Sequence, residues 1–208
     1  MDSIIKSFLT GENENTVEDV AKDFSEEQKL ELFKGMEFYA KGGDCNAQYW
    51  LSEMYEDGIG VPPDDKQAFF WGKLCAEKSS DHYCHTFVGR CYEEGKGTEK
   101  DEDEAIEWYQ KATLNGSTRA FIYMARIHER NDDHEEAIDC YMRAHHQYEK
   151  RKDRKVCKES VIELATKYQV DLIDEWIEMH RRVMILQKEN ENLNNLLRDI
   201  DLSKKIDL

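Results

Sequence analysis

The chain has 208 residues, of which 39% are hydrophobic, 36% are charged and only 2 are proline, and its formal net charge is −16. Segments rich in alanine, glutamate, lysine and leucine favour an all-α fold, and no apolar run is long enough to cross a bilayer. The acidic excess lies in the first part: residues 150–208 hold 13 basic and 12 acidic side chains, which leaves 16 against 33 elsewhere. Such a surface repels nucleic acid and anionic lipid, so neither is expected as a partner.

The N-terminus does not have the order of a secretory signal. Asp2 precedes the apolar stretch, and Lys6 and Ser7 interrupt it. We therefore expect a cytoplasmic protein whose cysteines are free thiols. The six cysteines are Cys45, Cys75, Cys84, Cys91, Cys140 and Cys157.

Residues 1–24 are read as an acidic N-terminal segment, in which residues 10–22 form a weak helix or a mobile arm. Ser25 and Gln28 then have the spacing of a capping box that begins a helix. An apolar stripe follows at helical spacing, which predicts a helix that covers the first end of a repeat array. The stripe consists of Leu30, Phe33, Met36 and Ala40.

A sequence motif that occurs twice, thirty-seven positions apart, is the strongest structural signal in the chain. Leu51, Tyr55, Gly58 and Gly60 are repeated as Val88, Tyr92, Gly95 and Gly97, and Asp64, Ala68 and Trp71 are repeated as Asp101, Ala105 and Trp108. A period of this length predicts stacked helix pairs. Within each repeat the glycines form a positive-φ loop, the aspartate caps the second helix, and the tryptophan faces inward.

A third, shorter unit begins at Ala120. Its loop lacks the two glycines, and Asn131-Asp132-Asp133 supplies the turn and cap chemistry instead. Ala137, Tyr141 and Ala144 continue its second helix. We expect a plainer helix hairpin here.

These residues resemble the Sel-one-like repeat, a relative of the tetratricopeptide repeat, over residues 45–149. The doubled Gly-x-Gly with tyrosine before it and tryptophan after it carries the resemblance, whereas Gly72 and Leu74 depart from the Tyr and Lys that the pattern prefers. The resemblance implies a short right-handed α-solenoid that acts as an adaptor or assembly scaffold. The array is assigned to residues 25–149 with its capping helix, followed by a capping helix and basic connection over 150–169.

A heptad pattern takes over near the C-terminus, where residues 170–203 are predicted to form a coiled coil of about four heptads. A lone asparagine at one seam position favours a parallel homodimer. The alternative is that this helix folds back on the solenoid, which the bulk of Trp176 favours. The seam positions are Leu172, Trp176, Met179, Val183, Leu186, Asn190, Leu193, Leu197 and Ile200.

In tetratricopeptide-like arrays the first helix of each pair lines the binding face, and this resemblance gives a set of groove candidates. They are Asn46, Tyr49, Glu53, Tyr83, Thr86, Arg90, Arg119, Ile122 and Arg126. The three arginines are unusual in an acidic protein and predict binding of an acidic side chain or a C-terminal carboxylate. The alternative is that they form salt bridges within the chain.

Two other clusters each have a functional and a structural interpretation. Cys75, His82, Cys84, His85 and Cys91 offer zinc-binding atoms, but their spacing matches no zinc module, so no metal or cofactor is expected. The basic run Lys150–Lys158 is either a surface for an acidic partner or a solvated connection between helices.

No phosphate-binding loop, dinucleotide motif or nucleophile elbow occurs in the sequence. We therefore predict a non-catalytic scaffold that binds a peptide or protein surface and dimerises through its C-terminal coiled coil. One alternative is a hydrolase like that proposed for cysteine-rich relatives of the repeat family, which the apparent lack of paired cysteines disfavours. Another is a purely structural subunit of a larger assembly.

Overall fold

The computed structural model describes residues 1–10, 16–147 and 151–168, and within these ranges every regular element is a helix. The chain divides into two units between Asp133 and His134. The first unit contains α1 (Asp2–Leu9), α2 (Val17–Ala21), α3 (Glu26–Lys41), α4 (Cys45–Asp57), α5 (Asp65–Ala76), α6 (His82–Glu94), α7 (Glu102–Leu114) and α8 (Thr118–Arg130). The second contains α9 (His134–Gln147) and α10 (Arg151–Tyr168).

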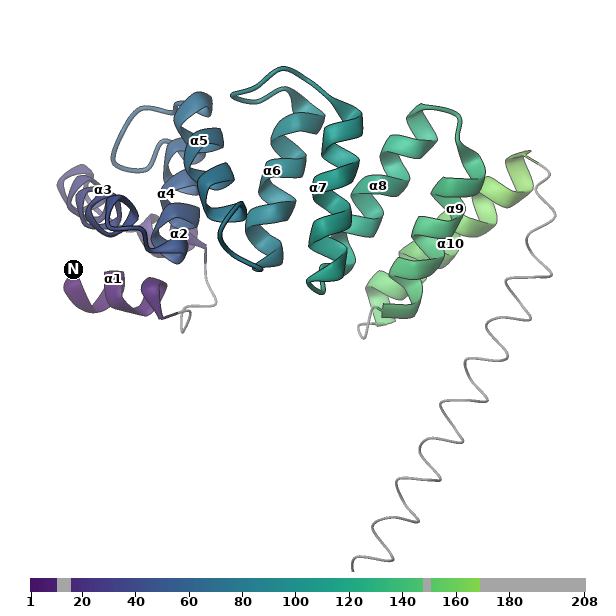
Figure 1. Ribbon diagram of the computed structural model, residues 1–208. Coiled ribbons are helices and arrows are strands. Elements are labelled where there is room, and N and C mark those ends of the chain that lie inside the picture. The colour runs from purple at the N-terminus through teal and green to yellow at the C-terminus, as the bar shows by residue number, and fades with distance from the viewer. Residues whose placement is uncertain (11–15, 148–150, 169–208) are drawn as a thin grey trace, which may run out of the picture. The chain divides into compact units, whose positions relative to one another are not determined.

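In the first unit, α3 to α8 follow one another in chain order and pack as successive neighbours (Figure 1). The pairs α4–α5 and α6–α7 are the two predicted repeats. Trp71 and Trp108 are 8% and 7% exposed and lie in two successive core clusters. The predicted helical solenoid and its inward-facing tryptophans are therefore confirmed.

Local sequence signals set the helix ends. The side chains of Asp64 and Asp101 accept hydrogen bonds from backbone amides in the first turns of α5 and α7. Ser25 and Gln28 form the reciprocal capping box at the start of α3. In the third repeat, Asp132 adopts a φ of 61° in the turn after α8. Asparagine and aspartate tolerate this backbone conformation better than most residues.

The second glycine of each repeat loop has a specific packing role. Gly60 has a φ of 78°, and a side chain there would collide with the backbone of Lys29 in α3. Gly97 has a φ of 71° and lies in the same way against the backbone of Asp65 at the start of α5. Each loop therefore rests on the helix that precedes its own hairpin, and only glycine combines the backbone conformation with so close an approach.

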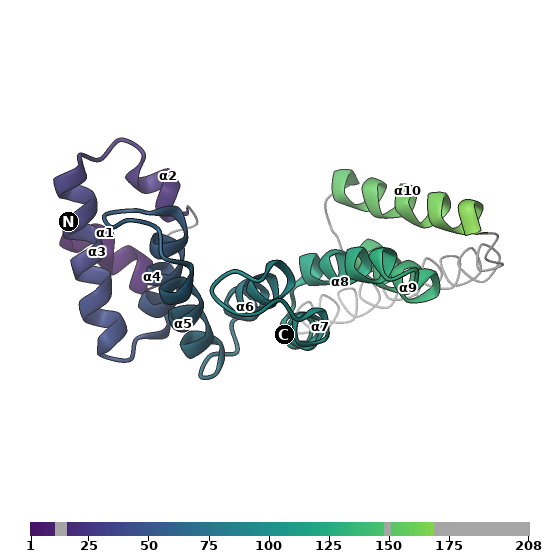
Figure 2. The ribbon, with the colours of Figure 1, turned by 90° about the horizontal axis from the view of Figure 1, so that it is seen from above.

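The N-terminal segment contributes more to the core than its acidic composition indicates. α1 and α2 pack against α4, and α1 also packs against α3 (Figure 2). Ile5, Phe8, Val17 and Ala21 are buried there. The interpretation of residues 10–22 as a weak helix or a mobile arm missed this packing. The helix α2 is only five residues long, and Thr16 caps its start.

Three further expectations are corrected. Leu30 is 38% exposed, and Leu32 takes the buried place in α3. Cys75 and Cys84 form a disulfide, with Cα atoms 6.1 Å apart, that links the end of α5 to the start of α6. The basic run falls largely within α10, which begins at Arg151, rather than in a connection between helices.

In the second unit, α9 and α10 pack against each other. Ala137, Tyr141 and Ala144 are buried on α9, as the helical spacing predicts, and Val161 and Leu164 are buried on α10. The predicted coiled-coil seam, from Leu172 to Ile200, lies outside the described residues, and the domain boundaries drawn from the sequence stay predictions.

Candidate functional site

The first helices of the three hairpins, α4, α6 and α8, are joined by contacts between their side chains. Arg90 of α6 donates a hydrogen bond to Glu56 of α4 at 2.5 Å. The Thr86 hydroxyl of α6 lies 3.3 Å from the Ser117 hydroxyl at the N-cap of α8. The contacts link α4 to α6 and α6 to the start of α8, and we call the predicted groove positions on these three helices the first-helix face.

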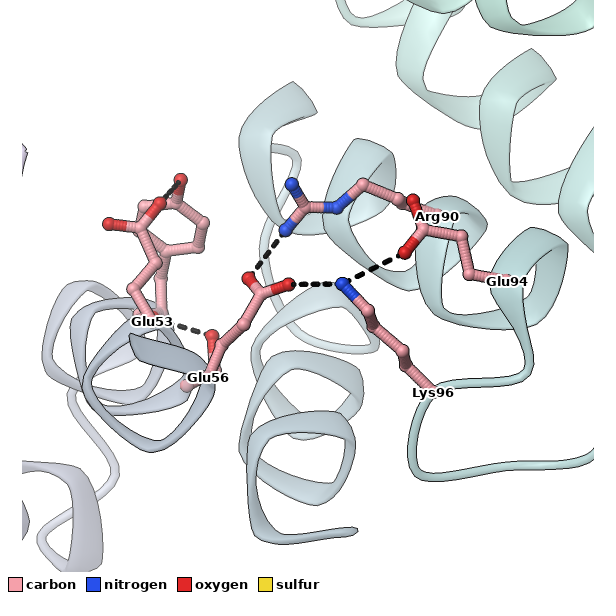
Figure 3. Close-up of polar contacts among 7 residues, drawn as sticks. Glu53, Glu56, Arg90, Glu94 and Lys96 are labelled. Carbon is pink, nitrogen blue, oxygen red and sulfur yellow. Dashed lines mark hydrogen bonds and ion pairs between the residues drawn. The ribbon is translucent and has the colours of Figure 1, made fainter. Parts of the chain in front are cut away.

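A network of ion pairs occupies the middle of this face (Figure 3). The Glu56 carboxylate receives Arg90 on one oxygen and Lys96, at 3.4 Å, on the other. Lys96 also pairs with Glu94 at 2.9 Å. Burial, the largest single effect, opposes the charge of Arg90, but Glu56 and the other nearby acidic groups together raise the pKa of the guanidinium. Arg90 is therefore engaged within the chain, which is the alternative that the sequence left open.

Glu53 lies beside this network without a cation of its own. Its Oε1 accepts a hydrogen bond from the Tyr49 hydroxyl at 2.5 Å, and no residue of the described part forms an ion pair with it. Burial, offset in part by the Tyr49 hydrogen bond and reinforced by the nearby charge of Asp57, raises the pKa of Glu53 to about 7. The pKa of Tyr49 is raised as well, chiefly by burial and next by the charge of Glu53.

A second tyrosine–glutamate hydrogen bond, at positions that are not equivalent in the repeat, joins α7 to α6. The Tyr109 hydroxyl of α7 donates a hydrogen bond to Glu93 at 2.7 Å, and Arg130 of α8 pairs with the other Glu93 oxygen at 2.9 Å. Arg130 also reaches Glu102 at 3.4 Å. Glu93 is therefore neutralised, whereas Glu53 is not.

Arg119 and Arg126 of α8 are exposed, and in the described ranges neither takes part in an ion pair. They are seven positions apart on one helix, so they point from the same side, with the half-buried Ile122 between them. Two guanidinium groups beside an apolar side chain can receive a carboxylate and its hydrocarbon stem.

Two predicted groove residues have structural roles. The Asn46 side-chain amide donates a hydrogen bond to the carbonyl of Leu9 at 2.8 Å and so ties α4 to α1. The Thr86 hydroxyl donates to the carbonyl of His82 at 2.7 Å within α6. Both side chains help to position the helices rather than extend toward solvent.

The sequence analysis missed a row of aromatic rings along this face. It runs from Phe8 of α1 through Trp50 and Tyr49 of α4 to Tyr83 and His82 of α6. Successive ring centroids are 4.8, 5.0, 6.2 and 4.2 Å apart. Tyr49 and Tyr83 were in the predicted set, but the row crosses three helices and has no signature in the linear sequence.

The Cys/His cluster has no arrangement of ligands for zinc. Cys75 and Cys84 are joined in the disulfide, and burial raises the pKa of Cys91 to about 12, which disfavours the thiolate that zinc requires. In the described residues no group of three or more His, Cys, Asp or Glu side chains is placed to hold a metal ion. The disulfide also removes the argument that unpaired cysteines disfavour a hydrolase.

None of the described helices combines the length and apolar character that crossing a bilayer requires. The family model described as the Sel1 repeat matches residues 45–80 and 82–117, which correspond to α4–α5 and α6–α7. No curated protein matches the chain.

Two solved structures share the fold at low sequence identity. A Sel1 repeat protein from Oxalobacter formigenes is 19% identical with a TM-score of 0.54, covering 74% of this chain and 80% of its own. The protective antigen c5321 of uropathogenic Escherichia coli, which displays an SLR fold, is 22% identical with a TM-score of 0.58. That alignment covers 67% of this chain and 30% of the antigen.

Proposed function

From the two Sel1 repeats that the chain contains, we propose that it is a non-catalytic interaction scaffold whose first-helix face binds a peptide segment of another protein. Sel1 repeat proteins generally act as protein-interaction scaffolds. The specific part of the proposal is that Arg119 and Arg126 receive an acidic side chain or a C-terminal carboxylate of that segment.

The observation that carries this proposal is the pairing state of the arginines. Arg90 and Arg130 are taken by glutamates of the chain, whereas Arg119 and Arg126 are exposed and have no ion pair in the described part. Unpaired guanidinium groups on an acidic protein lose little when they bind a carboxylate, because no internal partner has to be displaced.

Selection of a displayed twelve-residue peptide library on the immobilised protein tests the proposal. We expect the recovered peptides to be enriched in Asp and Glu, and the double variant Arg119→Ala/Arg126→Ala to abolish that enrichment. Synthetic versions of the recovered peptides should bind the double variant roughly 10–100-fold more weakly, as expected for loss of two charge-assisted contacts. Retention of the acidic enrichment by the double variant would contradict the proposal.

A matched control has the same change in net charge at other exposed positions. Lys66→Ala/Arg143→Ala removes two positive charges outside the first-helix face. This control should leave peptide recovery unchanged, so that a general electrostatic effect is separated from a local one.

The heptad pattern of residues 170–203 supports the second part of the proposal, that the scaffold is a homodimer. Two copies of the face would increase the apparent affinity for a partner that carries two binding segments. Multi-angle light scattering of the full chain and of residues 1–169 tests this part. The full chain should have twice its monomer mass, and the shortened chain should be a monomer.

A further inference from the structure

The aromatic row on the first-helix face becomes more exposed toward α6. Phe8 is fully buried at one end, Trp50 and Tyr49 are half-buried, and Tyr83 at the α6 end is 59% exposed. The Tyr49 and Tyr83 centroids are 6.2 Å apart with a tilt of 39° between the rings. The exposed ring of Tyr83, beside the half-buried ring of Tyr49, offers an aromatic surface to a ligand.

Rings elsewhere in these repeats already receive cations from the chain itself. The Lys111 ammonium lies 4.0 Å from the Trp108 ring centroid, and the Lys73 ammonium lies 5.5 Å from the Phe69 centroid. In the described residues no Lys or Arg takes such a position over Tyr49 or Tyr83.

The carboxylate next to this pair also lacks a cation. Glu53 is held by the Tyr49 hydroxyl, while Arg90, whose charge also acts on Glu53, is paired with Glu56. Asp57 adds a second negative charge one turn along α4. A positive group placed here would complement both the ring faces and the carboxylate.

We propose that Tyr49, Tyr83 and Glu53 form a subsite for a lysine or arginine side chain of the bound peptide. The inference rests on the proposed function, because it assigns a second anchor to the same face. Charge complementarity commits the subsite to a basic group: the rings attract a cation, and Glu53 offers a carboxyl group that has no ion pair in the described part. It also explains why a half-buried carboxyl group is kept here without an internal cation.

The two anchors lie on different helices of the face. The basic side chain lies at the α4–α6 end, and the acidic group lies on α8 against Arg119 and Arg126. The Thr86–Ser117 contact links α6 to the start of α8, which lies between the two anchors along the chain. We therefore expect single peptides to carry a basic and an acidic residue together.

The same peptide selection, carried out on Tyr83→Ala and on Glu53→Gln, tests the subsite. Tyr83 is exposed and Gln is nearly isosteric with Glu, so both variants are expected to fold, which circular dichroism checks. Wild-type protein should recover peptides that contain Lys or Arg in addition to Asp or Glu. Both variants should lose the basic enrichment and keep the acidic one, whereas Arg119→Ala/Arg126→Ala should show the opposite pattern.

A recovered peptide and its analogue with norleucine in place of lysine give the quantitative test by fluorescence anisotropy. Norleucine should weaken binding to the wild type about tenfold, in the range of a cation–π contact next to a carboxylate, and should hardly change binding to Glu53→Gln/Tyr83→Ala. Acidic enrichment without basic enrichment, or an equal norleucine effect on both proteins, overturns the subsite alone. Basic enrichment without the acidic one overturns the proposed role of Arg119 and Arg126, and no enrichment at all overturns both.

Discussion

Gly72 of α5 lies directly against the ring of Phe87 of α6: a Cβ at Gly72 would be 2.5 Å from Phe87 Cδ1. Tyr109 stands at the equivalent position of the second repeat and packs its ring against Gly89 instead. In the first repeat a ring from α6 fills the space beside Gly72, and in the second repeat a ring from α7 fills the space beside Gly89. The departure of Gly72 from the repeat pattern is compensated by an aromatic ring from the next hairpin.

Gly72→Ala should consequently destabilise the protein, although alanine is the better helix former. Overpacking of this kind costs ~1–3 kcal/mol, and the gain in helix propensity returns at most about 1 kcal/mol. Urea unfolding measures the change. Addition of Phe87→Leu should recover part of the loss if the two residues are in contact, and strictly additive effects would contradict the packing described.

Gly97→Ala should be more harmful than Gly116→Ala. Both glycines have positive φ, 71° and 95°, so both substitutions carry the backbone cost of about 1–2 kcal/mol. Gly116 has open space around it, whereas Gly97 lies against the Asp65 backbone, which adds roughly 1–3 kcal/mol. Equal losses in chemical denaturation would show that the loop does not rest on α5.

The Cys75–Cys84 disulfide should be detectable by counting thiols. Alkylation of the unfolded, unreduced protein followed by mass spectrometry should modify four of the six cysteines. Cys75→Ser/Cys84→Ser should lower the free energy of unfolding by about 2–3 kcal/mol, because the bond closes a loop with a sequence separation of 9. Modification of all six cysteines in protein purified without reductant would contradict this bond.

Glu53 should make stability fall as the pH rises. Its folded-state pKa of about 7 lies above its ordinary value of 4.5, so between these values the folded state holds a proton that the unfolded state has lost. The wild type should therefore lose stability from pH 5 to pH 8 by ~1–3 kcal/mol more than Glu53→Gln. Glu77→Gln, an exposed change at the end of α5, should follow the wild type in thermal or urea unfolding at each pH.

The sequence predicts what local chemistry determines. The caps at Ser25, Asp64 and Asp101, the positive-φ loops and the buried tryptophans all follow from signals a few residues long, repeated at a fixed period. The resemblance to a known repeat then supplies the stacking of the hairpins.

The candidate site depends on pairings that are distant in the sequence, and these could not be predicted. Arg90 and Glu56 are 34 positions apart, and Arg130 and Glu93 are 37 positions apart. In the same way, α1 reaches the core through Trp50, whose ring nitrogen donates a hydrogen bond to the carbonyl of Phe8. The expected cytoplasmic location predicts free thiols, whereas the packing of α5 against α6 brings Cys75 and Cys84 together in a disulfide.

Gly60 packs against α3 and Gly97 packs against α5, the helix before each repeat. The sequence repeat and the smallest fragment that can fold therefore begin at different residues. Residues 82–117, cut out along the sequence period, would leave the loop around Gly97 with no surface beneath it. A fragment that folds on its own has to include α5, the helix that precedes this repeat. Insertion or deletion of a repeat would therefore be tolerated best when it moves α5 together with α6 and the loop that follows.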